Sequence, residues 1–549
     1  MDNKYLIINY NILNYDIIRS AVPKFEYGGF VDCKYDEYYD SGNYVLFCDD
    51  EGELLSNLNM WAEEEKYAKL TVIINDSDPQ LNELYAKDVN DAIKKYGITK
   101  DFQCYVYGDD GTVFYPLERE SLGLIRFVDI TKVPIFDFVA KYPLTLALDK
   151  RHIDFDTATV KSDVQINVAM LGFGSCNRGL FNALVSTNQF TEVREGKLEP
   201  KPVNYFLYTE NADELDDEVF DYFRYLRHYA WLKVKEKDYL PLPHIPANEK
   251  LFLYDKSRIV NQLKAVMSDN DSANVVIIDF EDDKKNVQIA NMLADSLEDN
   301  IKIFVKVGQT LSGNDIRPHG RCTVYGNLTS VVYNLNLANG GAFGDMAYDR
   351  HMAYISECMP EANADTVSEL AKRKWFEMSP SKRQSNLYSC LSIRPKLNLL
   401  GYDIIKDEAA VDVSEEFFAK YQAGDEILYC DDPTGRRRVV SYGDCEFKEN
   451  TVRNNFAKQE HLRWNAYEIC CGVLPATVEE IRTKSKTQLF EEHKHGNLTT
   501  YDGLLKYRRI AAALKGISES EADVIKYDYQ IMDYVVRLVR RNGYKIVLR

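Results

Sequence analysis

The segment VAMLGFGSCNRGLF, residues 168–181, decides how the rest of the chain is interpreted. An apolar run ends at Leu171, and Gly172 and Gly174 follow it directly. A glycine after a strand permits a tight turn, and a second glycine lets an anion approach the main chain. The free amides at the start of the next helix then bind that anion. The segment therefore predicts a strand, a glycine turn that is a candidate phosphate site, and a helix.

The turn departs from the dinucleotide pattern Gly-x-Gly-x-x-Gly at its last position. Asn177 stands where the third glycine is expected, and Arg178 follows it. An asparagine amide donates to phosphate or ribose oxygens, and a guanidinium is a forked donor suited to phosphate. We expect these two residues to contact a phosphate, together with Ser175 in the same turn. An alternative is that the glycines only turn the chain and that the site is empty.

Two acidic residues further along are candidates for a sugar or base edge. Asp279 lies at the end of the apolar run 275–280, and Glu210 follows the strand-like run 203–208. Ligands of doubly wound sheets lie at the carboxyl ends of the strands, where both acids are expected. Glu210 is further from the glycines than the usual spacing of about 20 residues. For both acids, a solvated carboxylate at a strand end is the alternative.

The fold class is predicted from alternating strands and helices. Apolar, β-branched runs separated by amphipathic helices indicate buried parallel strands in doubly wound sheets. These runs are 44–50, 70–76, 166–171, 203–208, 275–280 and 301–307. We predict an α/β protein with a degenerate Rossmann-like domain at 1–150, which lacks a glycine turn, and a Rossmann-like nucleotide-binding domain at 160–345.

The pattern changes to helices from about residue 345. Apolar residues at three- and four-residue spacing predict helices at 346–358, 366–377, 381–400, 456–471 and 523–541. A helical connector is therefore expected at 346–450, and a small, mainly α domain at 451–549.

Composition excludes several classes of protein. The 549 residues carry a formal charge of −19, which opposes non-specific binding to duplex DNA. The 11 cysteines show no C-x-x-C pair and no zinc-like spacing, which is typical of reduced thiols in a cytoplasm. No apolar run approaches the roughly 20 residues of a membrane helix, and no signal peptide is visible. We predict a cytoplasmic protein without a membrane segment or a metal site.

A second candidate pocket lies in the helical part. Residues 460–465, EHLRWN, place an acid, an imidazole, a guanidinium and an indole on one helix, and the loop 494–502, KHGNLTTYD, is polar and aromatic. Trp464 as plain core and His461 as a structural histidine are the alternatives. The predicted pocket residues are Glu460, His461, Arg463, Trp464, Lys494, His495, Asn497, Tyr501 and Asp502.

These residues carry a resemblance. The segment 456–546 resembles the bacterial ryanodine-receptor-type (RyR) domain. The matching positions are Ala457, Glu460, His461, Arg463, Trp464, Gly472, Lys494, His495, Asn497, Leu498, Tyr501, Asp502, Leu504, Asp528 and Gly543, whereas Gly496 stands where proline is usual. Residues 347–401 resemble the helical connector found with such domains. The Gly172 turn and the segment 116–144 resemble the tandem RCK/TrkA-N-type domains that regulate potassium channels.

The resemblance implies a sensor. Domains of the RCK/TrkA-N type bind adenine nucleotides or dinucleotides such as NAD, and they convert ligand occupancy into altered packing between paired subunits. The expected protein is a homodimer that signals, in phage defence for example, to its RyR-type domain or to a separate effector or channel subunit. One alternative is an NAD(P)-dependent or nucleotide-processing enzyme, although the chain lacks a Gly-x-x-x-x-Gly-Lys-Ser/Thr loop and we assign no catalytic residue. The other is an interaction scaffold with vestigial pockets.

Overall fold

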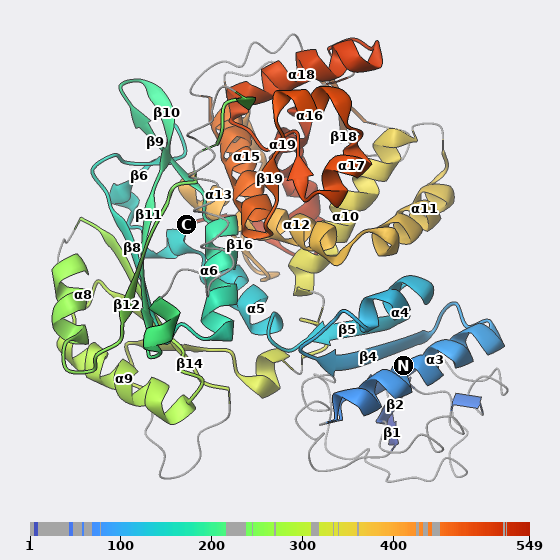
Figure 1. Ribbon diagram of the computed structural model, residues 1–549, viewed down its shortest axis with the longest axis horizontal. Helices are drawn as coiled ribbons and strands as arrows, with labels where there is room; N and C mark the ends of the chain where they lie inside the picture. Colours follow the sequence, from blue (N-terminus) through green and yellow to red (C-terminus); the bar gives the residue numbers. More distant parts are fainter. Residues whose placement is uncertain are drawn as a thin grey trace. The chain divides into compact units, whose positions relative to one another are not determined.

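The computed structural model (Figure 1) divides into two compact units, each built from two stretches of chain. Unit 1 contains Met1–Asp137 and Gly326–Arg383, and unit 2 contains Phe138–Tyr325 and Gln384–Arg549. The structure describes residues 5–8, 43–47, 58–59, 69–76, 78–215, 238–243, 245–267, 271–308, 318–332, 334–338, 340–359, 362–423, 428–431, 437–441, 451–519, 522 and 524–549. The predicted four-domain division remains a prediction.

Unit 1 contains a parallel sheet of five strands. The strands are β1 (Tyr5–Ile8), β2 (Asn43–Phe47), β3 (Lys69–Ile74), β4 (Phe102–Gly108) and β5 (Ile125–Asp129). The helices among its described residues are α3 (Pro79–Tyr96), α4 (Phe114–Glu120), α10 (Gly341–Cys358) and α11 (Ala364–Glu377). The boundary between the units falls within α5 (Val133–Lys141) and α12 (Pro380–Leu391).

The described strands of this sheet follow one another in the order β1-β2-β3-β4-β5. Among them the order never reverses, so the doubly wound arrangement expected for residues 1–150 is not found in the described part. Right-handed crossovers that always advance in one direction place their helices on one face. α3 and α4 cover that face and bury Val72, Val106 and Phe127.

A later segment of the chain covers the opposite face of the same sheet. Side chains alternate between the faces of a strand, so Ile73, Tyr107 and Val128 point away from α3 and α4. They form one buried cluster with Val331 and Ala338, more than 200 residues after β5. Val331 and Ala338 thus cover the face that a second set of crossover helices covers in a doubly wound sheet.

Unit 2 contains a parallel sheet of six strands. They are β8 (Ile166–Leu171), β11 (Val203–Thr209), β12 (Ala247–Leu253), β13 (Ala273–Ile278), β14 (Lys302–Lys306) and β15 (Cys322–Tyr325). The order is β12-β11-β8-β13-β14-β15, so the direction of winding reverses at β8. The predicted strands 166–171, 203–208, 275–280 and 301–307 are confirmed within one or two residues.

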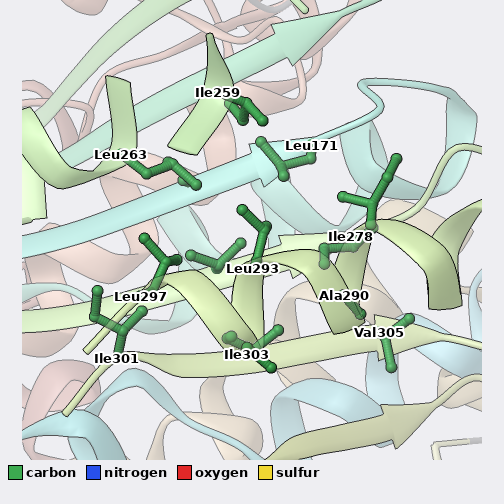
Figure 2. Packing of buried hydrophobic residues seen from close by; sticks show 14 of the residues in the cluster. Leu171, Ile259, Leu263, Ile278, Ala290, Leu293, Leu297, Ile301, Ile303 and Val305 are labelled. Atoms are coloured by element: carbon green, nitrogen blue, oxygen red, sulfur yellow. The ribbon is translucent and has the colours of Figure 1, made fainter. Parts of the chain in front are cut away.

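Helices lie on both faces of this sheet. α8 (Ile259–Met267) and α9 (Asp283–Ser296) cover one face in a single apolar cluster. Residues of the cluster shown in Figure 2 are Leu171, Ile278, Ile303 and Val305 from the sheet and Ile259, Leu263, Ala290 and Leu293 from the helices. α6 (Ser175–Thr187) covers the other face, where Phe181 packs edge-on against Tyr205 at 4.9 Å between ring centroids.

An asparagine ladder fixes the register of four neighbouring strands. Asn248 donates to Asn204 (3.0 Å), Asn204 to Asn167 (2.9 Å) and Asn167 to Asn274 (2.9 Å). The last amide donates to the carbonyl oxygen of Met267 at 3.2 Å. All four positions are register partners. A slip of one residue in any strand would turn its asparagine to the other face and break the ladder.

The rest of unit 2 is mainly helical. Its helices are α13 (Ile393–Leu399), α14 (Ser414–Tyr421), α15 (Val452–Cys470), α16 (Val478–Thr483), α17 (Lys486–Glu491), α18 (Tyr501–Lys515), α19 (Lys526–Asp533) and α20 (Val535–Arg541). Its strand pairs are β6 (Ile153–Asp154) with β7 (Thr159–Val160), β9 (Phe190–Arg194) with β10 (Lys197–Lys201), β16 (Tyr402–Ile405) with β21 (Lys545–Leu548), β17 (Leu428–Asp431) with β18 (Arg437–Ser441), and β19 (Leu474–Pro475) with β20 (Lys494–His495).

The helix α15 connects this part to the sheet because it packs against both α6 and α19. The predicted helix 381–400 is divided into α12 and α13 at Ser392. Pro395 explains the break, because its ring collides with the carbonyl of Leu391 in a continuous helix. Within the described residues, no helix is long and apolar enough to cross a membrane.

Candidate functional site

The glycine turn lies where the winding of the six-stranded sheet reverses, between β8 and α6. Gly172 has φ +78°, and a Cβ at this position would lie 2.3 Å from the carbonyl oxygen of Asp279. The ends of β8 and β13 therefore approach so closely that only glycine fits. The open crevice at such a reversal is where ligands of α/β sheets bind.

A carboxylate of the protein occupies the start of α6. The main-chain nitrogen and the hydroxyl of Ser175 both donate to Oε1 of Glu281 at 3.2 Å. A Cβ on Gly174 would lie 2.5 Å from the same oxygen. Ser175 and Glu281 are both exposed, so this corner is open to solvent. Glu281 therefore stands where the sequence predicts a bound phosphate.

Asn177 and Arg178 donate to the turn itself. The buried Asn177 amide donates to the carbonyl oxygens of Leu171 (3.2 Å) and Gly172 (2.7 Å). Nε of Arg178 donates to the carbonyl oxygen of Phe173 at 3.0 Å. Asn177, which stands in place of the third glycine, thus stabilises the turn by hydrogen bonds to its main-chain carbonyl groups. Phosphate contacts by these two residues remain a prediction.

The two predicted acids have different environments. Asp279 is buried, accepts from Nζ of Lys306 at 2.9 Å, and accepts the main-chain N–H of Glu281 at 3.0 Å. Burial, aided by Asp279, raises the pKa of the neighbouring Cys176 thiol to about 12. The exposed Glu210 forms an ion pair with Lys285 of α9. Asp279 is thus an internal ion-pair partner, whereas Glu210 faces solvent.

Sequence reasoning missed Glu281, Lys285 and Lys306. A usable sequence signal existed for Lys306, because Asp279 and Lys306 both lie near the ends of predicted parallel strands, 275–280 and 301–307, and such ends meet at one edge of the sheet. No pattern in the sequence points to Glu281, because its contact with Ser175 depends on the close approach of β8 and β13.

The predicted pocket residues of the helical part separate into two clusters on α15. The aromatic cluster contains His461, Trp464, His495 and Tyr501. The ring centroids of Trp464 and His495 are 4.9 Å apart, and those of His461 and Trp464 are 5.9 Å apart. His461 contacts the carbonyl oxygen of Thr499 at 2.8 Å through Nε2. Its other nitrogen lies 3.3 Å from the Asp528 carboxylate, whose pKa burial raises.

The ionic cluster contains Glu460, Arg463, Lys396 and Ser389. Glu460 accepts from Ser389 (2.6 Å), from Lys396 (2.8 Å) and from Nε of Arg463 (3.0 Å). Glu460, Arg463 and Lys396 are each 3% exposed or less. These contacts join α15 to α12 and α13, on a different side of the helix from the aromatic cluster.

The remaining predicted residues lie at the edge of this part. Asp502 is exposed in the first turn of α18, where its charge suits the helix dipole. The Asn497 main-chain nitrogen donates to Nδ1 of His495 at 3.1 Å. Lys494 pairs with Glu480 and Glu492. Burial acts to raise the pKa of Glu480, but bonds from Lys494, Thr477 and Lys484 outweigh it and hold the pKa at about 2.

The Glu480 charge is expected to stabilise unit 2 in a pH-dependent way. Because its folded pKa of about 2 lies below the ordinary 4.5, the stabilisation is present above pH 4.5 and is lost as the pH falls toward 2. We expect Glu480→Gln to lower the free energy of unfolding by roughly 2–3 kcal/mol at pH 7. Urea unfolding of both proteins between pH 7 and 3 measures the difference. A difference that does not shrink below pH 4.5 contradicts the assignment.

Comparison of the chain with protein-family models, with curated proteins and with solved structures gives no match in any of the three. The resemblance to RyR-type and RCK/TrkA-N-type domains therefore remains a prediction.

Proposed function

We propose that the protein is a regulatory sensor that binds a nucleotide or dinucleotide at the carboxyl edge of the six-stranded sheet. One observation carries the proposal: the strand order reverses at β8, and the Gly172 turn lies at that reversal. Counted from β8, the order is 3-2-1-4-5-6, which is the order of Rossmann dinucleotide-binding sheets. The exposed start of α6 then presents its amides to a phosphate.

Glu281 makes this site responsive. A phosphate that binds the Ser175 amide must displace the Glu281 carboxylate, because both use the same donor. Displacement of the Glu281 carboxylate moves the connection between β13 and α9. Lys285, in the first turn of α9, forms an ion pair with Glu210 near this connection. Ligand binding then favours one arrangement of this corner over another, as a sensor requires.

α6 and α15 supply the route from this site to the helical part. α6 begins at the turn and packs against α15, which carries the aromatic and ionic clusters. In this proposal α15 belongs to an RyR-type output domain. Two chains form a homodimer, and ligand binding alters the packing between them. The pKa values of Lys306 and of the Cys176 thiol are both raised, so neither side chain is poised to exchange protons at neutral pH, and this favours binding over chemistry at this edge of the sheet.

Removing the internal carboxylate is expected to strengthen nucleotide binding. We expect Glu281→Ala to bind a nucleotide about tenfold more tightly than the unchanged protein, because one charge-assisted competitor is lost. Calorimetric titration with ATP, AMP, NAD⁺ and NADH measures the change. The matched control is Glu195→Ala, because Glu195 is also exposed and also has a positive φ (52°, against 61° at Glu281) but lies in the β9–β10 turn. Its affinity should equal that of the unchanged protein.

A scaffold is the second candidate, and the contact between Glu281 and Ser175 favours it. In a scaffold the carboxylate permanently replaces a lost ligand and holds the corner closed. If no nucleotide binds to either the unchanged protein or Glu281→Ala, the sensor proposal fails and the scaffold stands. Glu281→Ala would then only lower the stability of unit 2.

A further inference from the structure

Two hydrogen-bond acceptors face the imidazole ring of His461, one at each nitrogen. Nε2 lies 2.8 Å from the main-chain carbonyl oxygen of Thr499, and Nδ1 lies 3.3 Å from Oδ2 of Asp528. A neutral imidazole carries only one N–H, so it donates to one of these acceptors but not to both. Both hydrogen bonds form together only if the ring and the carboxylate hold one further proton between them.

This further proton satisfies both contacts on either partner. On the ring it makes an imidazolium that donates to both acceptors, and on Asp528 it makes a carboxylic acid that donates to Nδ1. The pair is then neutral overall, which suits its environment, because the side chains of His461 and Asp528 are only 4% and 12% exposed. Burial also raises the pKa of Asp528. Loss of the proton leaves a buried negative charge and turns a lone pair of the ring toward an acceptor.

The contacts of His461 join three elements of unit 2. His461 belongs to α15 and Asp528 to α19, and Thr499 directly precedes the N-cap residue of α18. The Thr499 carbonyl oxygen also accepts from Asn465 of α15 at 2.9 Å, and the Thr499 hydroxyl donates to the carbonyl oxygen of Pro241 at 2.6 Å. A change of protonation at His461 therefore acts on the packing of α18 and α19 against α15 (Figure 1).

Other ionisable side chains among the described residues surround the pair. Glu460 and Arg463 of α15 act on the pKa of Asp528 with opposite signs, since Glu460 raises it and Arg463 lowers it. Tyr501 of α18 contacts the His461 ring edge-on, and burial raises the pKa of Tyr501 well above its ordinary value, so its hydroxyl stays neutral at moderately alkaline pH. The groups one contact further out are Lys458, His495, Tyr529 and Arg453.

We propose that one proton shared by His461 and Asp528 holds α15 to α19 and to the start of α18, and that this contact opens as the pH rises above neutral. The proton passes to solvent, the pair becomes negative, and one of the two hydrogen bonds of His461 breaks. In an unfolded chain a histidine and an aspartate have released this proton by about pH 6.5. The stabilisation is therefore complete below about pH 6.5 and is lost as the pH rises and the folded pair releases its proton. This pH-sensitive contact is separate from the proposed nucleotide site and does not depend on it.

Asp528→Asn tests the proposal because it removes the need for the further proton. The new amide donates to Nδ1 of a neutral His461, and the Nε2–H still donates to Thr499. Hydrogen exchange of α19 peptides in the full chain, divided by the intrinsic exchange rate at each pH, gives the opening constant of this contact. Relative to Asp528→Asn, we expect the opening constant of the unchanged protein to rise at least about tenfold between pH 7 and 9, because the folded pair holds a proton that the open pair has lost. A ratio that stays constant over this range overturns the proposal. Loss of α19 protection in Asp528→Asn already at pH 7 also overturns it.

Asp403→Asn is the matched control. Asp403 also belongs to unit 2 and its side chain is 19% exposed, but its partner is Arg394, which keeps its charge throughout this pH range. This variant loses an ion pair without changing the number of protons that are bound. The ratio of its opening constant to that of the unchanged protein, measured on peptides of β16, should therefore be the same at pH 7 and pH 9. An equal pH dependence in this comparison would mean that unit 2 opens generally in alkali, and it would overturn the role of His461 and Asp528.

Discussion

Replacing Gly172 by alanine is expected to lower the free energy of unfolding by more than about 3 kcal/mol. The new Cβ would meet the Asp279 carbonyl at 2.3 Å, and this oxygen belongs to main chain that cannot rotate away. The positive φ of +78° adds strain of its own. Hydrogen exchange of peptides from β8 and β13 measures this loss of stability locally, because the new Cβ disturbs the contact between the ends of these two strands.

Gly196→Ala separates the two causes. Gly196 has nearly the same φ, +76°, but nothing lies within 4 Å of a Cβ built there. This control therefore carries only the backbone strain and should lose about 1–2 kcal/mol. Equal losses in the two variants would mean that the ends of β8 and β13 do not approach as closely as described.

The second large effect is expected at the buried ion pair of Arg453 and Asp533. Arg453 is 2% exposed and donates to both carboxylate oxygens of Asp533 at 2.9 Å, while its guanidinium stacks on Tyr529 at 4.0 Å. The Tyr421 hydroxyl also donates to Asp533, at 2.7 Å. Arg453→Gln leaves the carboxylate buried without a counterion, so we expect a loss of about 3–5 kcal/mol. Denaturant unfolding followed by circular dichroism measures it.

Arg540→Gln is the control for the loss of an arginine. Arg540 pairs with Asp412 at 2.9 Å, but its side chain is 46% exposed. Exposed pairs contribute at most about 1 kcal/mol, because water and salt screen them. Arg453→Lys adds a further comparison, since it keeps the charge and loses the forked geometry, and it should fall between the two. A loss for Arg453→Gln no larger than that of the control would contradict the burial of this pair.

Much of the second sheet was predictable from the sequence. Strands buried on both faces appear as continuous apolar runs, and β8 begins and ends where its run does. The order of the first sheet was not predictable, because its second face is covered by Val331 and Ala338 from a distant part of the chain. Apolar patterns show that a face is buried but do not show which distant segment buries it. Pro395, by contrast, marks the break at Ser392 in the sequence itself.

Only the main-chain part of the candidate site, the glycine turn, was predictable from the sequence; the side chain that contacts it was not. The glycine turn followed from Gly172 and Gly174, but the carboxylate that meets it belongs to a residue 107 positions after Gly174. On α15, 14 of the 19 residues are buried, so no exposed polar face marks which side chains point together. Glu460 and His461, adjacent in sequence, therefore belong to different clusters.

Unit 1 is built from two stretches that lie far apart in the chain, and this has a consequence for its synthesis on the ribosome. Ile73, Tyr107 and Val128 leave the exit tunnel long before their partners Val331 and Ala338. At roughly 5–20 residues per second, the nascent chain waits on the order of 10–40 s with this apolar surface uncovered. Newly made chains are thus open to self-association or chaperone capture during that interval, and slower translation would prolong it.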